Sequence, residues 1–190
     1  MRDALQFLLE TFFGLFALAL LLRFHLQWLR APTHNPVSVF LIALTNWIVL
    51  PARRVVPRLR GLDMATLVLS WLVEVILLVL TYWVLGPGLG PAVGASAMVI
   101  GFLALVQLTK MSLWTLIVAV IIQALLSWVN PTSPAGPLLN SLTRPFLRVF
   151  QRRIPPVGNV DLSPLFLLVA CQLLLFAVAW IEAEAVQSLS

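Results

Sequence analysis

The sequence predicts an all-α membrane protein in which four transmembrane helices form two parallel two-helix repeats, each with a short interfacial amphipathic helix. Three observations lead to this prediction: an apolar composition, four long apolar segments and an internal repeat. Of the 190 residues, 61% are hydrophobic and 10% are charged, whereas a soluble domain has about 25% charged residues. The mean hydropathy is +1.03. These values exclude a soluble globular domain, a disordered chain and a free nucleic-acid-binding domain.

The four apolar segments set the expected spans. About 20 apolar residues in a helix cross a bilayer core of about 30 Å, and in lipid a helix satisfies its own backbone polar groups. The segments are residues 4–29, 62–85, 111–129 and 162–181. A fifth apolar stretch, residues 92–108, is short and starts with small residues. We expect it either to lie at the outer interface or to extend the third helix.

Positive charge gathers in the gaps between these segments. One zone separates the first and second segments and the other separates the third and fourth. The zones are Arg23, Arg30, Arg53, Arg54, Arg58 and Arg60, and then Arg144, Arg148, Arg152 and Arg153. The positive-inside rule predicts that both zones are cytoplasmic, which places both termini on the outer side.

The two halves of the chain match each other at a shift of 98 residues. This shift aligns Leu44-Thr45 with Leu142-Thr143, Arg54 with Arg152, and Asp63 with Asp161. Just upstream the shift is two residues longer, so that Trp28 aligns with Trp128. We therefore divide the chain into a first repeat (1–86), an outer-face linker with an apolar helix (87–110) and a second repeat (111–190).

A helix too short to span is expected between the two spans of each repeat. In the first repeat it covers residues 37–50, and Asn35 and Pro36 are well suited to begin it. In the second repeat, apolar residues share one helical face, and Arg144, Arg148 and Arg152 share another. Such a helix lies in the cytoplasmic interface with its arginines toward water or lipid phosphates. Pro145 is expected to break it into two pieces.

The motifs of the second half resemble those of the YggT family, also called YlmG. They are Leu126-Ser127-Trp128-Val129, Arg144-Pro145, the string from Arg152 to Pro156, and Asp161-Leu162-Ser163-Pro164. The resemblance covers nearly the whole chain, although the first half is more degenerate. It implies a multi-pass protein of the bacterial inner membrane, so that the outer side is the periplasm. The family has been linked to osmotic or ion homeostasis, to cell division and nucleoid distribution, and, in plastid relatives, to assembly of a membrane cytochrome.

Four intramembrane polar residues are candidates for function: Glu74, Gln172, Gln123 and Glu10. Charge at the bilayer centre costs about 2.5–3.5 kcal/mol, so Glu74 is either a proton or cation site or a neutral acid that hydrogen-bonds Gln123, Ser127 or Gln172. We favour the neutral acid, because one carboxylate makes a poor ion pathway. Gln172 is the counterpart of Glu74 at the 98-residue shift, and the two could form a polar clasp. Glu10 either lines an outer vestibule or snorkels to the interface.

Asp63, Asp161 and Ser163 stand where the second and fourth spans begin. We expect them to cap these helices and to complement the positive N-terminal dipole. Ion pairs from Asp63 to Arg54, and from Asp161 to Arg152 or Arg153, would latch the amphipathic helices onto the spans.

The basic residues are candidate contacts to anionic lipid headgroups or to an unknown membrane or cell-division protein. These residues are Arg53, Arg54, Arg58, Arg144, Arg148, Arg152 and Arg153. Each contributes about 1 kcal/mol near an anionic leaflet. Nucleic acid is not expected as a partner, because this surface faces lipid headgroups, and a homo-oligomer is left open. Two isolated histidines and one cysteine predict no metal and no cofactor.

The leading interpretation is a non-enzymatic inner-membrane scaffold that presents its basic helices to lipids and partner proteins. One alternative is a monovalent-cation transport or channel component in osmotic homeostasis. A weaker alternative is an assembly factor for a membrane complex.

Overall fold

The computed structural model is all-helical. It describes residues 2–32, 35–57, 59, 61–82, 93–130, 132–153 and 161–187. Within these ranges there are six helices and no β-strand: α1 (Arg2–Trp28), α2 (Pro36–Val55), α3 (Met64–Leu80), α4 (Val93–Val129), α5 (Gly136–Gln151) and α6 (Ser163–Gln187). The predicted fold class is confirmed.

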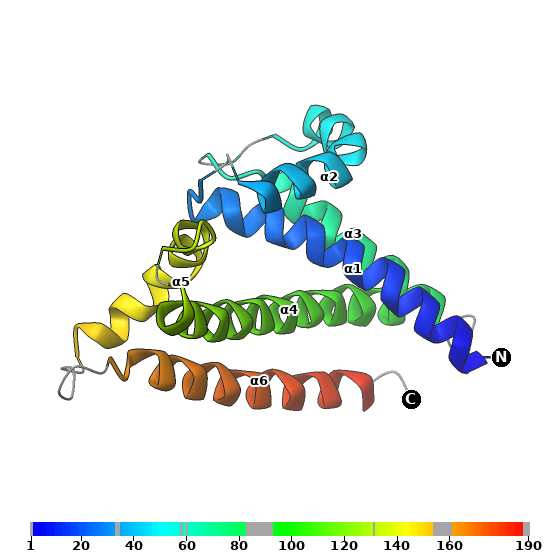
Figure 1. The fold of residues 1–190 in the computed structure, drawn as a ribbon. Coiled ribbons are helices and arrows are strands. Elements are labelled where there is room, and N and C mark those ends of the chain that lie inside the picture. Colours follow the sequence, from blue (N-terminus) through cyan, green and yellow to red (C-terminus); the bar gives the residue numbers. More distant parts are fainter. Residues whose placement is uncertain are drawn as a thin grey trace.

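Four of the described helices are long and apolar enough to cross a membrane, namely α1, α2, α4 from Ala97 onward, and α6. The protein is therefore a multi-pass membrane protein. The predicted segments 4–29, 111–129 and 162–181 lie in α1, α4 and α6. The predicted segment 62–85 contains α3, an apolar helix of 17 residues that runs beside α1 (Figure 1). Residues 83–85 of the segment lie outside the described ranges. The expectation of a helix over residues 37–50 that is too short to span is wrong. α2 has 20 residues and meets the length and composition criteria, even though Arg53 and Arg54 lie in its last turn.

Each half is a hairpin of two long helices with an amphipathic helix packed on it. α1 packs along α3 with α2 on both, and α4 packs along α6 with α5 on both (Figure 1). The halves join where α3 and α1 contact α4. Both termini lie at one end of the molecule, away from α5 (Figure 1).

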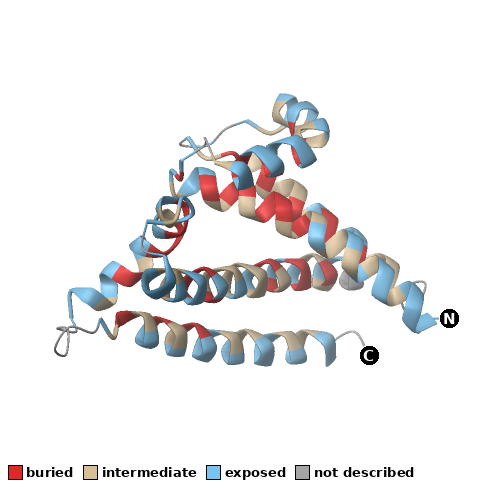
Figure 2. Ribbon diagram, in the orientation of Figure 1, coloured by how far each residue is buried: buried red, intermediate tan, exposed pale blue. Residues whose placement is uncertain are grey.

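Burial follows the contacts within and between the two hairpins. The outer faces of the long helices are exposed (Figure 2), with Phe12 70% and Phe176 73% exposed. Large apolar side chains on an outer face suit contact with lipid. One buried cluster joins the halves and contains equivalent residues of both, since Ala19 and Ala119 belong to it, as do Leu41 and Leu139.

The start of α2 follows the prediction. Asn35 is the N-cap, and its Oδ1 accepts a hydrogen bond from the backbone N–H of Ser38 at 2.9 Å. Pro36 occupies the first turn, where its missing N–H costs nothing.

Of the stretch 92–108, residues 93–108 extend the third helix, which is the second of the two alternatives. α4 has 37 residues and is therefore about 55 Å long. The added turns pack on α3, where Nε1 of Trp71 donates to the carbonyl oxygen of Gly101 at 2.9 Å. A side chain at position 101 would place its Cβ 3.3 Å from the Trp71 ring, so the absence of a side chain permits this approach.

The predicted break at Pro145 is wrong. α5 continues from Gly136 to Gln151 with Pro145 inside it. A proline removes one backbone hydrogen bond, but apolar burial on both sides opposes a break: Leu142 packs in the cluster with Ala119, and Leu147 packs with Ile117 and Leu167. Packing against α4 and α6 therefore holds the helix together.

Candidate functional site: polar contacts of the amphipathic helices

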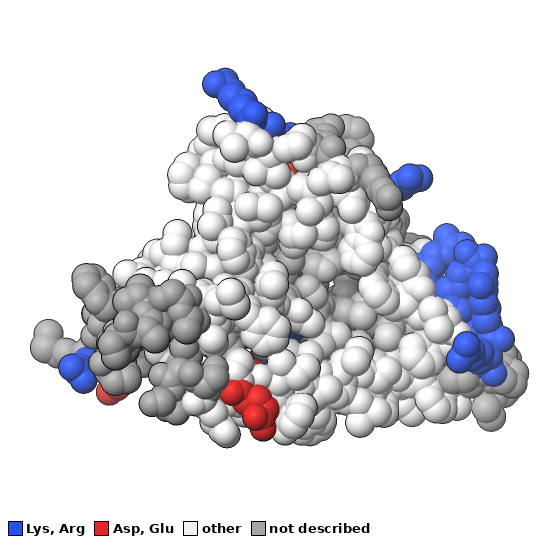
Figure 3. Space-filling model, turned by 180° about the vertical axis from the view of Figure 1, so that it is seen from behind, with Lys and Arg blue, Asp and Glu red and all other residues white. Residues whose placement is uncertain are grey.

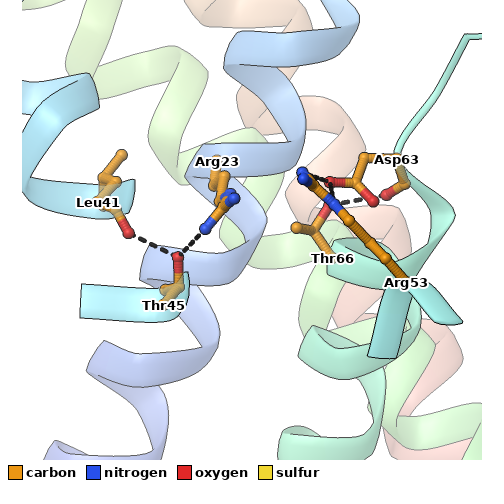
Figure 4. A network of polar contacts seen from close by, with 6 residues as sticks. All are labelled: Arg23, Leu41, Thr45, Arg53, Asp63 and Thr66. Carbon is orange, nitrogen blue, oxygen red and sulfur yellow. Dashed lines mark hydrogen bonds and ion pairs between the residues drawn. The ribbon is translucent and has the colours of Figure 1, made fainter. Parts of the chain in front are cut away.

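A buried threonine on each amphipathic helix contacts the first long helix of its half. In the first half, Nη1 of Arg23 on α1 donates to Oγ1 of Thr45 on α2 at 2.7 Å (Figure 4). In the second half, Oγ1 of Thr143 on α5 donates to the side-chain oxygen of Gln123 on α4. Both threonines are 0% exposed, and Oγ1 of each lies within hydrogen-bonding distance of the carbonyl oxygen four residues earlier. The two contacts are therefore equivalent, but only the first contains a charge.

The end of each amphipathic helix contacts the aspartate that precedes the next long helix. In the first half, Arg53 forms an ion pair with Asp63 (Figure 4), and Arg53 Nε donates to Asp63 Oδ2 at 3.0 Å. In the second half, Gln151 Nε2 donates to Asp161 Oδ2 at 2.9 Å. Arg53 and Gln151 are 98 positions apart, so this contact also recurs, with a neutral amide in place of the guanidinium.

The predicted ion pairs to Arg54 and to Arg152 or Arg153 are therefore not found among the described residues, although each aspartate contacts the end of its amphipathic helix. Asp63 pairs with Arg53 rather than Arg54, and Asp161 bonds to Gln151 rather than to Arg152 or Arg153. The reason is helical phase, because neighbouring residues point about 100° apart on a helix.

The two aspartates also differ as helix caps. Asp63 makes no side-chain cap hydrogen bond, and its Oδ1 is buried without a partner among the described residues. Asp161 Oδ1 accepts from the Ser163 backbone N–H at 2.8 Å. Partial burial works against ionisation of Asp161, but hydrogen bonds from Ser163 and Gln151 outweigh it and lower the pKa of the carboxyl. Ser163 is the first residue of α6 and is fully buried.

The intramembrane candidates do not come together among the described residues. Glu74 is buried on α3 with 3% exposure. The residues expected to meet Glu74 lie elsewhere. Gln123 accepts a hydrogen bond from Thr143, Ser127 donates to the carbonyl of Ala124, and Gln172 is exposed. Glu10 is exposed and accepts from Gln6 within α1.

The basic candidates divide between buried and exposed positions. The four arginines of the second half, Arg144, Arg148, Arg152 and Arg153, are exposed on and just after α5. Figure 3 shows Lys and Arg side chains gathered at the end of the molecule where α5 lies. In the first half, Arg54 is exposed and Arg53 forms an ion pair with Asp63. Arg58 lies outside the described residues.

The sequence reasoning missed two sets of residues. The first set is Arg23, which is 5% exposed and donates to Thr45. The 100-residue offset that aligns Trp28 with Trp128 aligns Arg23 with Gln123. Near the other end, Glu182 on α6 pairs with Lys110 on α4 and accepts from Gln107 at 2.6 Å. No local pattern links residues more than 70 positions apart.

A largely apolar cavity of about 380 Å³ lies between the halves. Leu and Phe side chains of α1, α4 and α5 dominate its walls, and His25 is the one titratable residue among those that line it. His25 Nδ1 lies 2.7 Å from the Leu21 carbonyl oxygen. Among the described residues, no three His, Cys, Asp or Glu side chains are grouped to hold a metal ion.

Comparison with known proteins gives one consistent result. The sequence profile of the CCB3/YggT family matches residues 2–84 and 102–181. A Pseudomonas aeruginosa protein described as uncharacterized is 35% identical over 92% of this chain and 87% of its own length. YggT of Escherichia coli, also described as uncharacterized, is 31% identical over 98% of this chain and 93% of its own length. No solved structure matches.

Proposed function

The chain belongs to the CCB3/YggT family, and from this premise we propose that it is a non-enzymatic organising protein of the bacterial inner membrane. It presents the exposed arginines of α5 to anionic lipids and to partner proteins. The same face is cytoplasmic and both termini are periplasmic, in accordance with the positive-inside rule.

One observation supports this proposal most directly: the four arginines on and just after α5 are exposed and unpaired among the described residues. The guanidinium groups of Arg144, Arg148, Arg152 and Arg153 form no hydrogen bond or ion pair with a described residue, and all four residues are exposed. The opposite face of α5 is buried through Leu138, Leu139 and Leu142. An amphipathic helix with one face on the protein and a cationic face outward is suited to anionic headgroups or to an acidic protein surface.

The apolar character of the cavity between the halves supports a non-enzymatic role. General acid–base or nucleophilic catalysis needs paired titratable groups within hydrogen-bonding reach. His25, the titratable residue of that cavity, has the backbone carbonyl of Leu21 as its hydrogen-bond partner.

A photo-crosslinking experiment in cells tests the proposal. A photoreactive amino acid at Val149, which is 54% exposed on α5, should yield protein adducts, and one at lipid-facing Phe176 should not. Substitution of Arg152→Glu with Arg153→Glu should abolish the Val149 adducts, whereas Arg2→Glu at the other end should leave them unchanged. Reporter fusions at the C-terminus confirm that the variants keep their orientation. Unchanged Val149 adducts in the double variant would contradict the proposal.

A second candidate function is monovalent-cation transport in osmotic homeostasis. It is favoured by the burial of Glu74 within α3. Flux of potassium, sodium and protons into proteoliposomes, measured for the protein and for Glu74→Gln, separates the two functions. Flux above that of empty liposomes that falls in the variant would favour transport. If the partners captured at Val149 are subunits of one membrane complex, the role is that of an assembly factor.

A further inference from the structure

Each half contains a pocket at the same place, between the end of its first long helix and the start of its amphipathic helix. The first-half pocket has a volume of about 260 Å³ and the second-half pocket about 550 Å³. Leu26 and Leu41 line the first, and Leu126 and Leu139, their equivalents in the repeat, line the second. The pockets are therefore a property of the repeat.

The two pockets differ in charge. Arg23 and Arg30 line the first, and the residues 100 positions later, Gln123 and Asn130, line the second. The first pocket thus carries two cationic side chains where the second carries two neutral amides.

Arg23 is not neutralised within its surroundings. It is 5% exposed, Nη1 donates to the neutral hydroxyl of Thr45, and Nε is buried without a partner among the described residues (Figure 4). The negative charge of Asp63 interacts with Arg23 at a distance, but Asp63 already forms an ion pair with Arg53. A buried guanidinium with a free donor is costly unless an anion meets it.

We propose that the first-half pocket is a binding site for the phosphate of one anionic phospholipid. Arg23 and Arg30 hold the phosphate oxygens as charge-assisted hydrogen-bond donors. Arg23 lies about one and a half turns from the end of α1, a depth from which an arginine reaches the headgroup level.

A phospholipid fits better than a soluble phosphate because apolar surface continues from the pocket. Leu26, Leu41 and Ile42 line it beside the arginines. From Ile42, which is 36% exposed, the same side of α2 continues to Val39, three residues earlier and 59% exposed. An amphiphile satisfies the cations with its headgroup and covers these side chains with its acyl chains. This site uses none of the α5 arginines on which the proposed function rests.

The second half supplies a matched control for the experiment. The protein is reconstituted into phosphatidylcholine nanodiscs that contain a small fraction of photoreactive phosphatidylglycerol, and adducts are mapped to peptides of either half. Arg23→Gln with Arg30→Asn gives the first pocket the residues of the second. Gln123→Arg with Asn130→Arg makes the reverse change. Arg30→Asn alone keeps the Arg23–Thr45 contact and serves if the double variant fails to fold.

Wild-type adducts should concentrate on the α1–α2 peptides. Loss of each arginine should reduce them about fivefold, and of both about 25-fold, while Gln123→Arg with Asn130→Arg should raise labelling of the α4–α5 peptides. Equal labelling of both halves in the wild type, labelling that is unaffected by the first pair of substitutions, or no rise with the second pair would overturn the proposal. Displacement by millimolar glycerol phosphate or inorganic phosphate would assign the pocket to a soluble anion and overturn the lipid assignment.

Discussion

Arg23 donates a hydrogen bond to Thr45 at 2.7 Å from a position 5% exposed, and this contact fastens α2 to α1. Its counterpart between Thr143 and Gln123 does the same for α5 and α4 without a charge. The repeat therefore keeps the place of the contact and changes its electrostatics.

Thr45→Val should destabilise the protein more than Thr143→Val. The first substitution removes a hydrogen bond to a buried cation, which contributes about 1.5–3 kcal/mol, and the second removes a neutral one that contributes about 0.5–1.5 kcal/mol. Denaturant unfolding in detergent micelles measures both. A larger loss for Thr143→Val would contradict the assigned roles.

Asp63→Asn should lower the free energy of unfolding by about 3 kcal/mol or more. The substitution leaves the charge of Arg53 without its partner at a site where Asp63 is 3% exposed. Asp161→Asn replaces an exposed acceptor, and it should cost about 1 kcal/mol or less. The same unfolding measurement compares them, and equal losses would show that the ion pair adds nothing beyond a hydrogen bond from a neutral donor.

The stability of the second half should depend on pH through Asp161. Its pKa in the folded protein is lowered by hydrogen bonds from Ser163 and Gln151, below the unfolded value of about 3.9. The resulting stabilisation is present above the unfolded pKa and is lost as the pH falls through the folded one. Unfolding midpoints of the protein and of Asp161→Asn should therefore converge below about pH 4. A constant difference across that range would exclude the linkage.

Gly101→Val should weaken the contact between the halves, because any side chain at position 101 meets the Trp71 ring, with Cβ at 3.3 Å. Overpacking of this kind costs about 1–3 kcal/mol. Gly101→Ala is the matched control, since the gain in helix propensity of about 1 kcal/mol offsets a smaller clash. Disulfide formation between cysteines introduced on α3 and α4 reports the separation. Undiminished cross-linking in Gly101→Val would contradict this role.

Lys110→Glu and Glu182→Lys should each loosen α6 from α4, and the combination should restore the contact. Both side chains are about a quarter exposed, so each loss is about 1 kcal/mol or less. A double-mutant cycle of unfolding free energies measures the coupling. Additive losses would show that the pair does not stabilise the packing.

Local signals in the sequence predicted much of the fold. Asn35 and Pro36 marked the start of α2 because capping depends on neighbouring residues alone. The alignment of Asp63 with Asp161 identified one position at which each amphipathic helix contacts its hairpin, and Thr45 and Thr143, which also align, mark a second contact that was not predicted. The partners escaped prediction: choosing Arg53 over Arg54 requires the rotational phase of α2 at its last turn, and one residue shifts that phase by about 100°.

Composition, span length and repeat spacing are local or periodic quantities, so the sequence by itself determined an all-helical, two-repeat membrane protein. Only the tertiary structure decided that α5 runs unbroken through Pro145, that residues 93–108 belong to α4, and that Arg23 lies buried against Thr45. Each of these depends on which distant surfaces pack together. The packing free energy of α5 is the sum of many side-chain contacts, whereas a mid-helix proline removes one backbone hydrogen bond. The packing therefore outweighs the local cost of Pro145.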